Sequence, residues 1–111
     1  MISTIGELIA RSAKTFNRKA FIRYLDNDNY ISFFQLEELR KKFNIYLNFI
    51  KVFNKDRIVV LMDNSPILAI LFLIIPGCFR TFVPINPHAG NEEIEYIISL
   101  TKPKLLITNK I

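Results

Sequence analysis

The chain has 111 residues, a net charge of +5 at pH 7 and a hydrophobic content of 50%, with ten Phe and four Tyr. This length allows one domain or part of one and excludes a second domain, and the apolar content excludes an intrinsically disordered protein. The only cysteine, Cys78, excludes an internal disulfide and a cysteine-based metal cluster, so the composition fits a reducing compartment.

The first predicted element is a short amphipathic helix from Thr4 to Lys14. Thr4, with Glu7 three positions later, has the pattern of a capping box, and apolar residues recur on one side of the helix. Because Glu7 and Arg11 interrupt the apolar residues, this segment does not have the pattern of a secretory signal. We therefore expect a cytoplasmic protein.

A β-hairpin is predicted next. The segment Ala20–Leu25 has the composition of a strand, and Asp26–Asn29 favours a turn with left-handed backbone. Tyr30–Ser32 then forms the second arm of the hairpin.

The strongest predicted helix covers Phe33 to Ile50. Ser32 and Gln35 have the pattern of its capping box, so the hairpin leads directly into this helix. Apolar residues recur at steps of three and four, with charged residues mostly between them. These apolar positions are Leu36, Leu39, Phe43, Tyr46, Leu47 and Ile50.

The densest basic group of the sequence lies in this helix and just after it. It alternates with Glu37, Glu38 and Asp56, and it lacks the aromatic or glycine pattern of RNA-binding and single-strand-binding modules. A solvated helix face is the better interpretation, and we predict no nucleic-acid partner. The basic group consists of Arg40, Lys41, Lys42, Lys51, Lys55 and Arg57.

The continuous apolar run from Arg57 to Met62 predicts a strand that is buried on both faces. Ser65 can cap the helix that follows, and Pro66 suits the first helical position, where its missing N–H leaves no hydrogen bond unmade. This helix should end near Pro76 and Gly77.

The same helix holds the longest apolar run, Ile67–Ile75. A membrane span needs about 18–20 apolar residues, and an extension of the run to Phe79 includes a proline and a glycine. A buried helix is therefore predicted, and no membrane span. Attachment of Ile67–Phe79 to a membrane surface stays open as a minor alternative.

The last elements are a short strand over Thr81–Pro84, a loop over Asn86–Gly90, a helix that ends at Pro103 and a strand over Lys104–Thr108. Acidic residues at the start of this last helix suit its dipole. Its predicted buried stripe consists of Ile94, Ile97 and Ile98.

The order strand, helix, strand, helix, strand from Arg57 to Thr108 has crossovers long enough for parallel pairing. We therefore predict an α/β fold in which an N-terminal helix and hairpin lead into a partial doubly wound parallel sheet with flanking helices. Residues 1–111 are expected to form a single partial domain.

Three segments resemble motifs of the AMP-forming adenylating enzymes, the family that includes acyl-CoA synthetases, luciferases and the adenylation domains of peptide synthetases. Ile31–Leu36 is similar to the motif that opens a long helix in that family. Met62–Pro66 and Val83–Pro87 are similar to its Asn-Ser-Pro-like turn and its Val-Pro-Leu/Ile-Asn/Asp-Pro turn. The resemblance covers Thr4 to Thr108 and implies the N-terminal subdomain of an AMP-binding ligase.

The sequence departs from the family pattern at two glycine positions. Phe79 stands where the family usually has glycine before the Val-Pro turn, and Gly77 lies two positions earlier. Lys55 begins a Lys-Asp-Arg segment where Gly-Asp-Arg is common. The geometry around Phe79 is the feature that the sequence leaves open.

The resemblance implies a parent enzyme that makes an acyl-adenylate from ATP and a carboxylic acid, with magnesium, and passes the acyl group to a thiol such as coenzyme A. In the family a Ser/Thr/Gly-rich loop that ends in Lys holds the phosphates, and a later Lys serves the transition state. Neither is in this chain, whose three glycines, Gly6, Gly77 and Gly90, are isolated. We therefore assign no catalytic or cofactor-binding residue and expect the chain to bind no cofactor alone.

Other combinations of residues give weaker signals for a catalytic site. His88 is the only histidine, so a surface or turn role is the better interpretation than a catalytic one. Cys78 has apolar neighbours, which favour inert burial over reactivity.

No metal site is predicted either. Glu92, Glu93 and Glu95 lie at successive helix positions that do not converge, so they are better interpreted as capping and solubilising residues. Asp26 and Asp28 alternate with asparagines like the start of a calcium loop, but the downstream Gly and Glu are missing.

Two hypotheses follow for the function. The first is a scaffold segment of an AMP-dependent acid–thiol ligase, inactive alone, whose partner is the missing C-terminal part of the ligase or another protein chain. The alternative is a non-catalytic interaction module that binds a protein through an exposed sheet edge or an apolar helix. The acid substrate and the oligomeric state are not encoded in these residues.

Overall fold

The structure is a computed structural model, and it describes residues 4–16, 19–23 and 30–109. Within these ranges the chain forms four helices and five strands. They are α1 (Ile5–Phe16), β1 (Ala20–Arg23), β2 (Tyr30–Ser32), α2 (Phe33–Phe49), β3 (Arg57–Leu61), α3 (Pro66–Gly77), β4 (Thr81–Ile85), α4 (Asn91–Thr101) and β5 (Leu105–Thr108).

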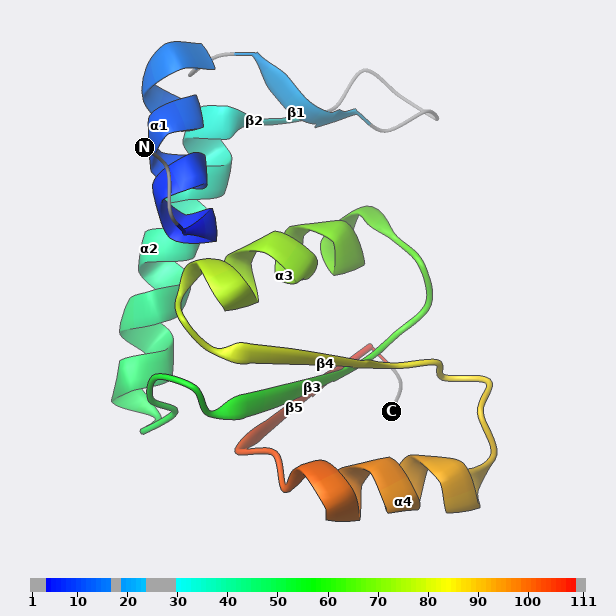
Figure 1. Ribbon diagram of the computed structural model, residues 1–111. Coiled ribbons are helices and arrows are strands. Elements are labelled where there is room, and N and C mark those ends of the chain that lie inside the picture. The colour runs from blue at the N-terminus through cyan, green and yellow to red at the C-terminus, as the bar shows by residue number, and fades with distance from the viewer. Residues whose placement is uncertain (1–3, 17–18, 24–29, 110–111) are drawn as a thin grey trace.

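The second half of the chain is a parallel three-stranded sheet with the strand order β4-β3-β5. Helix α3 covers one face of this sheet and α4 lies on the other (Figure 1). The central strand β3 is apolar because it is enclosed from both sides, and Ile58, Val59 and Val60 have no exposed surface. The predicted doubly wound α/β fold is thus confirmed.

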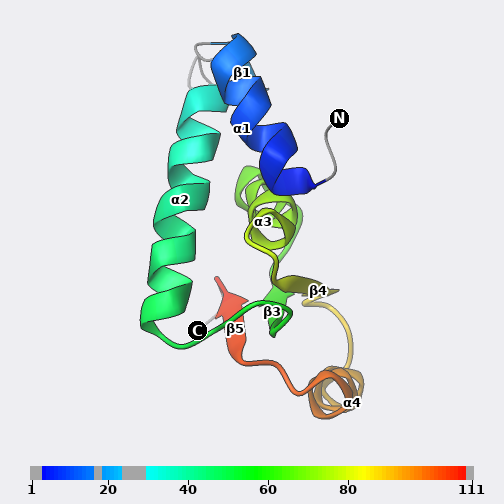
Figure 2. The ribbon, with the colours of Figure 1, turned by 60° about the vertical axis from the view of Figure 1, so that its left-hand side comes forward.

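The first half of the chain adds a helical layer to the α3 side. Helices α1 and α2 pack against each other and against α3 (Figure 2). The antiparallel hairpin β1–β2 confirms the predicted strand pair, while its turn, Asp26–Asn29, lies outside the described residues.

Helix α1 crosses α3 at two glycines. A Cβ atom added at Gly6 would lie 2.7 Å from the carbonyl oxygen of Gly77, closer than packed atoms allow. The glycine at position 6 is therefore required for this crossing.

The predicted helix caps are present. The hydroxyl of Ser32 accepts a hydrogen bond from Gln35 N, and the Gln35 side chain accepts one from Ser32 N, at 3.1 and 2.9 Å. Thr4 Oγ1 accepts from Glu7 N at 3.0 Å, and Ser65 Oγ accepts from Leu68 N at 3.1 Å. These local bonds fix where α1, α2 and α3 begin.

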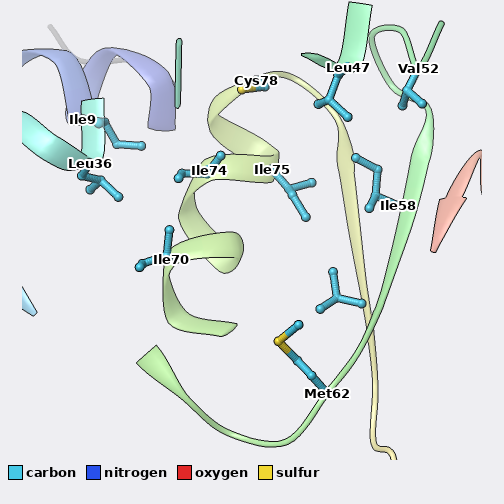
Figure 3. Close-up of a cluster of buried hydrophobic side chains, with 11 residues drawn as sticks. Ile9, Leu36, Leu47, Val52, Ile58, Met62, Ile70, Ile74, Ile75 and Cys78 are labelled. Carbon is cyan, nitrogen blue, oxygen red and sulfur yellow. The ribbon is translucent and has the colours of Figure 1, made fainter. Parts of the chain in front are cut away.

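The core lies between α3 and one face of the sheet, closed by α1 and α2. Ile70, Ile74 and Ile75 of α3 are buried here, with Ile58 of β3 and Met62 just after it (Figure 3). The apolar run in α3 is thus a core segment, as predicted. None of the described helices is long and apolar enough to cross a membrane.

Two predicted apolar stripes are less buried than their patterns indicate. In α4, Ile94, Ile97 and Ile98 are only half-buried, and no residue of this helix is buried, so that prediction is wrong. The reason is geometric: α4 is the only described element on its face of a narrow sheet (Figure 1). In α2, Leu39 and Tyr46 are exposed.

A buried arginine joins α2 to the sheet. The Arg80 side chain is 4% exposed, and its guanidinium donates to Asn44 Oδ1 at 2.6 Å, Asn48 Oδ1 at 2.8 Å, Val52 O at 2.7 Å and Cys78 O at 2.6 Å. These acceptors are neutral, and the two asparagines lie in the second half of α2, where the helix dipole favours a cation. Arg80 carries no local sequence pattern that predicts this burial.

Candidate functional site

The polar residues of the second half gather where β3 and β4 end. The two strands are parallel and in register from Arg57 opposite Thr81 to Leu61 opposite Ile85, so their carboxyl ends lie at the same edge of the sheet. In doubly wound sheets this edge is where ligands bind. The loops that follow the two strands form the candidate site.

The first loop runs from Met62 to Ser65. Ser65 has extended backbone and caps α3, with Pro66 at the first helical position, as predicted. This leaves Asp63 and Asn64 exposed at the strand end.

The second loop, residues 86–90, is an Asx-type turn. Asn86 Oδ1 accepts a hydrogen bond from His88 N at 2.9 Å, and Asn86 O accepts one from Ala89 N at 3.1 Å. Gly90 is the N-cap of α4 and makes no side-chain cap. This turn positions the imidazole of His88 toward the first loop.

A side-chain contact joins the two loops. His88 Nε2 lies 2.9 Å from Asp63 Oδ1, and both side chains are exposed, at 72% and 52%. His88 therefore has the turn and surface position that the sequence predicts, together with a partner that the sequence analysis missed. The parallel order of β3 and β4 is the signal that could have found it, because residues that follow neighbouring parallel strands meet at one edge.

A pocket of about 390 Å³ lies beneath this pair. Its floor is apolar, formed by residues of β3, β4 and α3 that include Val60, Ile85 and Leu68. Its rim is polar and consists of Asp63, Asn64, Asn86 and His88.

An apolar groove of about 740 Å³ continues from the pocket along α3 and β4. Phe72 and Phe82 line it and meet edge to face, with ring centroids 5.7 Å apart. Phe72 is 59% exposed, so this groove presents apolar surface at the side of the sheet.

The site does not suit a triphosphate. A phosphate group would bind at the free main-chain N–H groups where α3 and α4 begin. Acidic side chains at both helix starts would repel it: Asp63 lies before α3, and Glu92 and Glu93 lie in the first turn of α4. Gly77 packs against Ile9 and Arg40 instead of forming a phosphate loop. We therefore derive no chemical step on ATP from these residues.

The remaining candidate residues do not extend the site. Among the described residues, no group of three or more His, Cys, Asp and Glu side chains could hold a metal ion. Asp26 and Asp28 lie outside the described ranges. Cys78 is buried, its thiol donates to Arg40 O at 3.4 Å, and burial raises the pKa of this thiol above its ordinary value of 9.0.

A sequence model of the family described as AMP-binding enzyme matches residues 9–111. No curated protein matches the sequence. Among solved structures, the chain is similar to Klebsiella oxytoca NpsA in complex with 3-hydroxyanthranilyl-AMSN, with a TM-score of 0.84 and 16% identity over 100% of this chain and 22% of that chain.

Two structures from Mycobacterium tuberculosis are similar as well. The N-terminal domain of FACL13 gives a TM-score of 0.85 and 23% identity over 96% of this chain and 27% of that chain. A fatty acyl CoA synthetase gives 0.81 and 24% over 95% and 21%. At these identities the likeness concerns the fold, and this chain spans between 21% and 27% of the length of the three structures.

Proposed function

Since the chain belongs to the AMP-binding enzyme family, we propose that it is the N-terminal scaffold segment of an AMP-dependent acid–thiol ligase of the acyl-CoA synthetase kind. In this proposal the intact ligase makes an acyl-adenylate from ATP and a carboxylic acid and then transfers the acyl group to a thiol such as coenzyme A. The segment supplies strands that support a nucleotide site built by residues outside it. It has no ligase activity alone.

The extent of the overlap is the observation that carries this proposal. The whole of this chain superimposes on NpsA, but it accounts for only 22% of that protein. The phosphate-binding loop and the lysine that the family resemblance implies have no counterpart among these residues. A segment that has the fold but lacks these groups fits a scaffold.

The two edge strands of the sheet, β4 and β5, support a role in which the sheet is extended by further strands beside one of them. Thr81 N donates to Asp56 O at 2.9 Å, and because main-chain groups alternate in direction, Pro84 faces the outer edge of β4, where it offers no N–H. Lys104 N donates to Arg57 O at 2.8 Å, so Leu105 and Ile107 direct their N–H and C=O groups outward from β5. The β5 edge is therefore the one that can accept a complete strand.

A second candidate function is a protein-interaction module. The open groove beside Phe72 and Phe82 favours it, because an apolar surface of this kind is a common feature of binding sites. In this alternative the bound partner is unrelated to the ligase family.

Nucleotide binding and partner identity test these functions. We expect no saturable binding when ATP and magnesium are titrated into the purified chain in a calorimeter, and specific ATP binding would refute the scaffold. A protein recovered with the chain from its own cells should carry a Ser/Thr/Gly-rich loop that ends in Lys. Recovery of a partner that lacks such a loop and that contacts Phe72 and Phe82 in the complex would favour the interaction module.

A further inference from the structure

Basic and aromatic side chains gather at the end of the sheet where the three strands begin, opposite the candidate site. From Phe49, the last residue of α2, to Lys55, Phe and Lys alternate at every second position. Lys51, Lys55 and Arg57 lie beyond the end of α2, so the predicted solvated helix face does not include them. The turn between α3 and β4 and the turn between α4 and β5 lie at the same end (Figure 1). We call this the basic–aromatic surface, and it consists of Phe49, Lys51, Phe53, Lys55, Arg57, Phe79, Lys102 and Lys104.

Hydrogen bonds hold the three segments together. Lys55 N donates to Phe79 O at 2.7 Å, which joins the first turn to the second. Arg57 Nη1 donates to Thr101 O at 3.0 Å, which joins β3 to the end of α4. The residues of the basic–aromatic surface are therefore neighbours in the fold, although they come from distant parts of the sequence.

The charge of this surface is one-sided. In the segments 49–57, 78–80 and 102–104 the only acidic residue is Asp56, and its carboxylate accepts a hydrogen bond from Phe53 N at 2.7 Å within the turn. Lys51, Lys55, Lys102 and Lys104 are exposed. A surface of this kind attracts an anionic partner.

The aromatic rings project outward and are not packed in the core. Phe49 is 82% exposed, Phe53 54% and Phe79 55%. Exposed rings on a surface that also carries lysines suit insertion among lipid headgroups. Stacking of nucleic-acid bases instead uses rings laid along a groove.

The backbone of this surface is strained. Lys51, Lys55, Phe79 and Lys102 have φ values of 64, 69, 62 and 48°, and they are all of the non-glycine residues with left-handed backbone in the described part of the chain. Glycine would adopt these conformations without a steric penalty, yet lysine and phenylalanine stand there. At Lys51 and Lys102 the left-handed backbone ends α2 and α4, while at Lys55 and Phe79 it lies in turns that no helix end requires. Strained backbone gathers at functional sites, which supports a role for the surface around Lys55 and Phe79.

We propose that the basic–aromatic surface binds the anionic headgroups of a lipid bilayer, with the Phe rings inserted at the interface and the Lys side chains at the lipid phosphates. The contact is peripheral to the bilayer. It leaves the carboxyl ends of β3 and β4 accessible, because they lie at the opposite end of the strands. It is independent of the proposed ligase scaffold.

Cosedimentation with vesicles tests the proposal. We expect the chain to pellet with vesicles of phosphatidylcholine and phosphatidylserine, to stay in solution with phosphatidylcholine alone, and to be released by high salt. A chain that pellets with neither kind of vesicle, or equally with both, overturns the proposal. Binding of a single-stranded RNA oligonucleotide by a chain that pellets with neither kind of vesicle would assign the surface to nucleic acid instead.

Two pairs of variants locate the contact. The double variant Lys51→Gln, Lys55→Gln should lower the partition coefficient by about fivefold for each lysine, while Lys41→Gln, Lys42→Gln changes the net charge equally and should have a smaller effect. Phe53→Ala should weaken binding, whereas Tyr96→Ala, at a 64% exposed site on α4, should not. Equal effects within each pair would contradict the assignment.

Phe79→Gly separates lipid binding from folding. The substitution removes a ring from the surface, and it also removes the steric strain of a non-glycine residue in left-handed backbone. The variant should therefore bind the anionic vesicles more weakly. Its circular dichroism spectrum and melting temperature should show an intact fold. Unchanged binding by this folded variant would contradict the role of the ring.

Discussion

Lys55 and Phe79 are joined by a main-chain hydrogen bond of 2.7 Å, and both have left-handed backbone, with φ values of 69 and 62°. They are the two positions where the family resemblance leads us to expect glycine. The turn before β4 thus keeps the backbone that glycine favours, although a phenylalanine occupies it. The departure from the family pattern adds backbone strain at these two positions and places an exposed phenylalanine ring at position 79. The fold is retained.

Phe79→Gly should stabilise the chain. Left-handed backbone costs a non-glycine residue about 1–2 kcal/mol, and the greater freedom of glycine in the unfolded chain offsets roughly 0.5–1 kcal/mol of this. We expect the free energy of unfolding to rise by about 0.5–1 kcal/mol in urea denaturation. Phe79→Ala is the matched control, because it removes the ring and keeps the Cβ atom. Equal stability of the two variants would show that the backbone is not strained.

Arg80→Met should destabilise the chain by about 2–4 kcal/mol. The substitution leaves the buried carbonyl oxygens of Val52 and Cys78 without their donor, and it removes the bonds to Asn44 Oδ1 and Asn48 Oδ1, which are part-buried. Thermal unfolding measures this loss. Lys41→Met is the control, because Lys41 is exposed and its ion pair with Glu38 is long, at 3.8 Å. A melting temperature of Arg80→Met equal to that of the control would contradict the structural role of Arg80.

Gly6→Ala should disrupt the crossing of α1 and α3. The added methyl group would lie 2.7 Å from Gly77 O, a backbone atom that cannot move aside without moving α3. We expect a loss of about 1–3 kcal/mol in unfolding free energy. At Gly90 an added Cβ meets no atom within 4 Å, so Gly90→Ala should cost only the N-cap preference for glycine over alanine, about 0.5 kcal/mol. Similar values for the two variants would show that the helices do not cross here.

Cys78 should react slowly with iodoacetamide in the folded chain and quickly in urea. Burial raises the pKa of its thiol above 9.0, so in the folded state the thiol stays neutral over a wider range of pH. The stabilising effect of this raised pKa is fully present below pH 9 and is lost as pH rises further. Relative to Cys78→Ala, the chain should therefore lose stability above about pH 9. A difference between the two that is independent of pH would contradict this.

The local features of the fold were predictable, while its long-range contacts were not. Caps such as Ser32 with Gln35 depend on residues three apart, and the buried strand Arg57–Leu61 follows from a continuous apolar run. The contacts of Arg80 with Asn44 and Asn48 span 36 and 32 positions and depend on how α2 packs on the sheet.

The candidate site shows the same division. Asp63 and His88 lie in loops that the sequence indicates, but their contact appears only when β3 and β4 pair in parallel. In α4 the stripe from Ile94 to Ile98 has the period of a buried helix, but periodicity identifies a face and not the amount of structure that covers it.

Pyrophosphate exchange tests the proposed scaffold role most directly. The rate of exchange between ATP and labelled pyrophosphate, with a panel of carboxylic acids, should be measured for the purified chain alone and for the chain mixed with the remainder of a family ligase that lacks its own N-terminal segment. We predict no exchange above background by the chain alone and exchange that depends on the acid in the mixture. Exchange by the chain alone, or the absence of exchange in every mixture, would contradict the account.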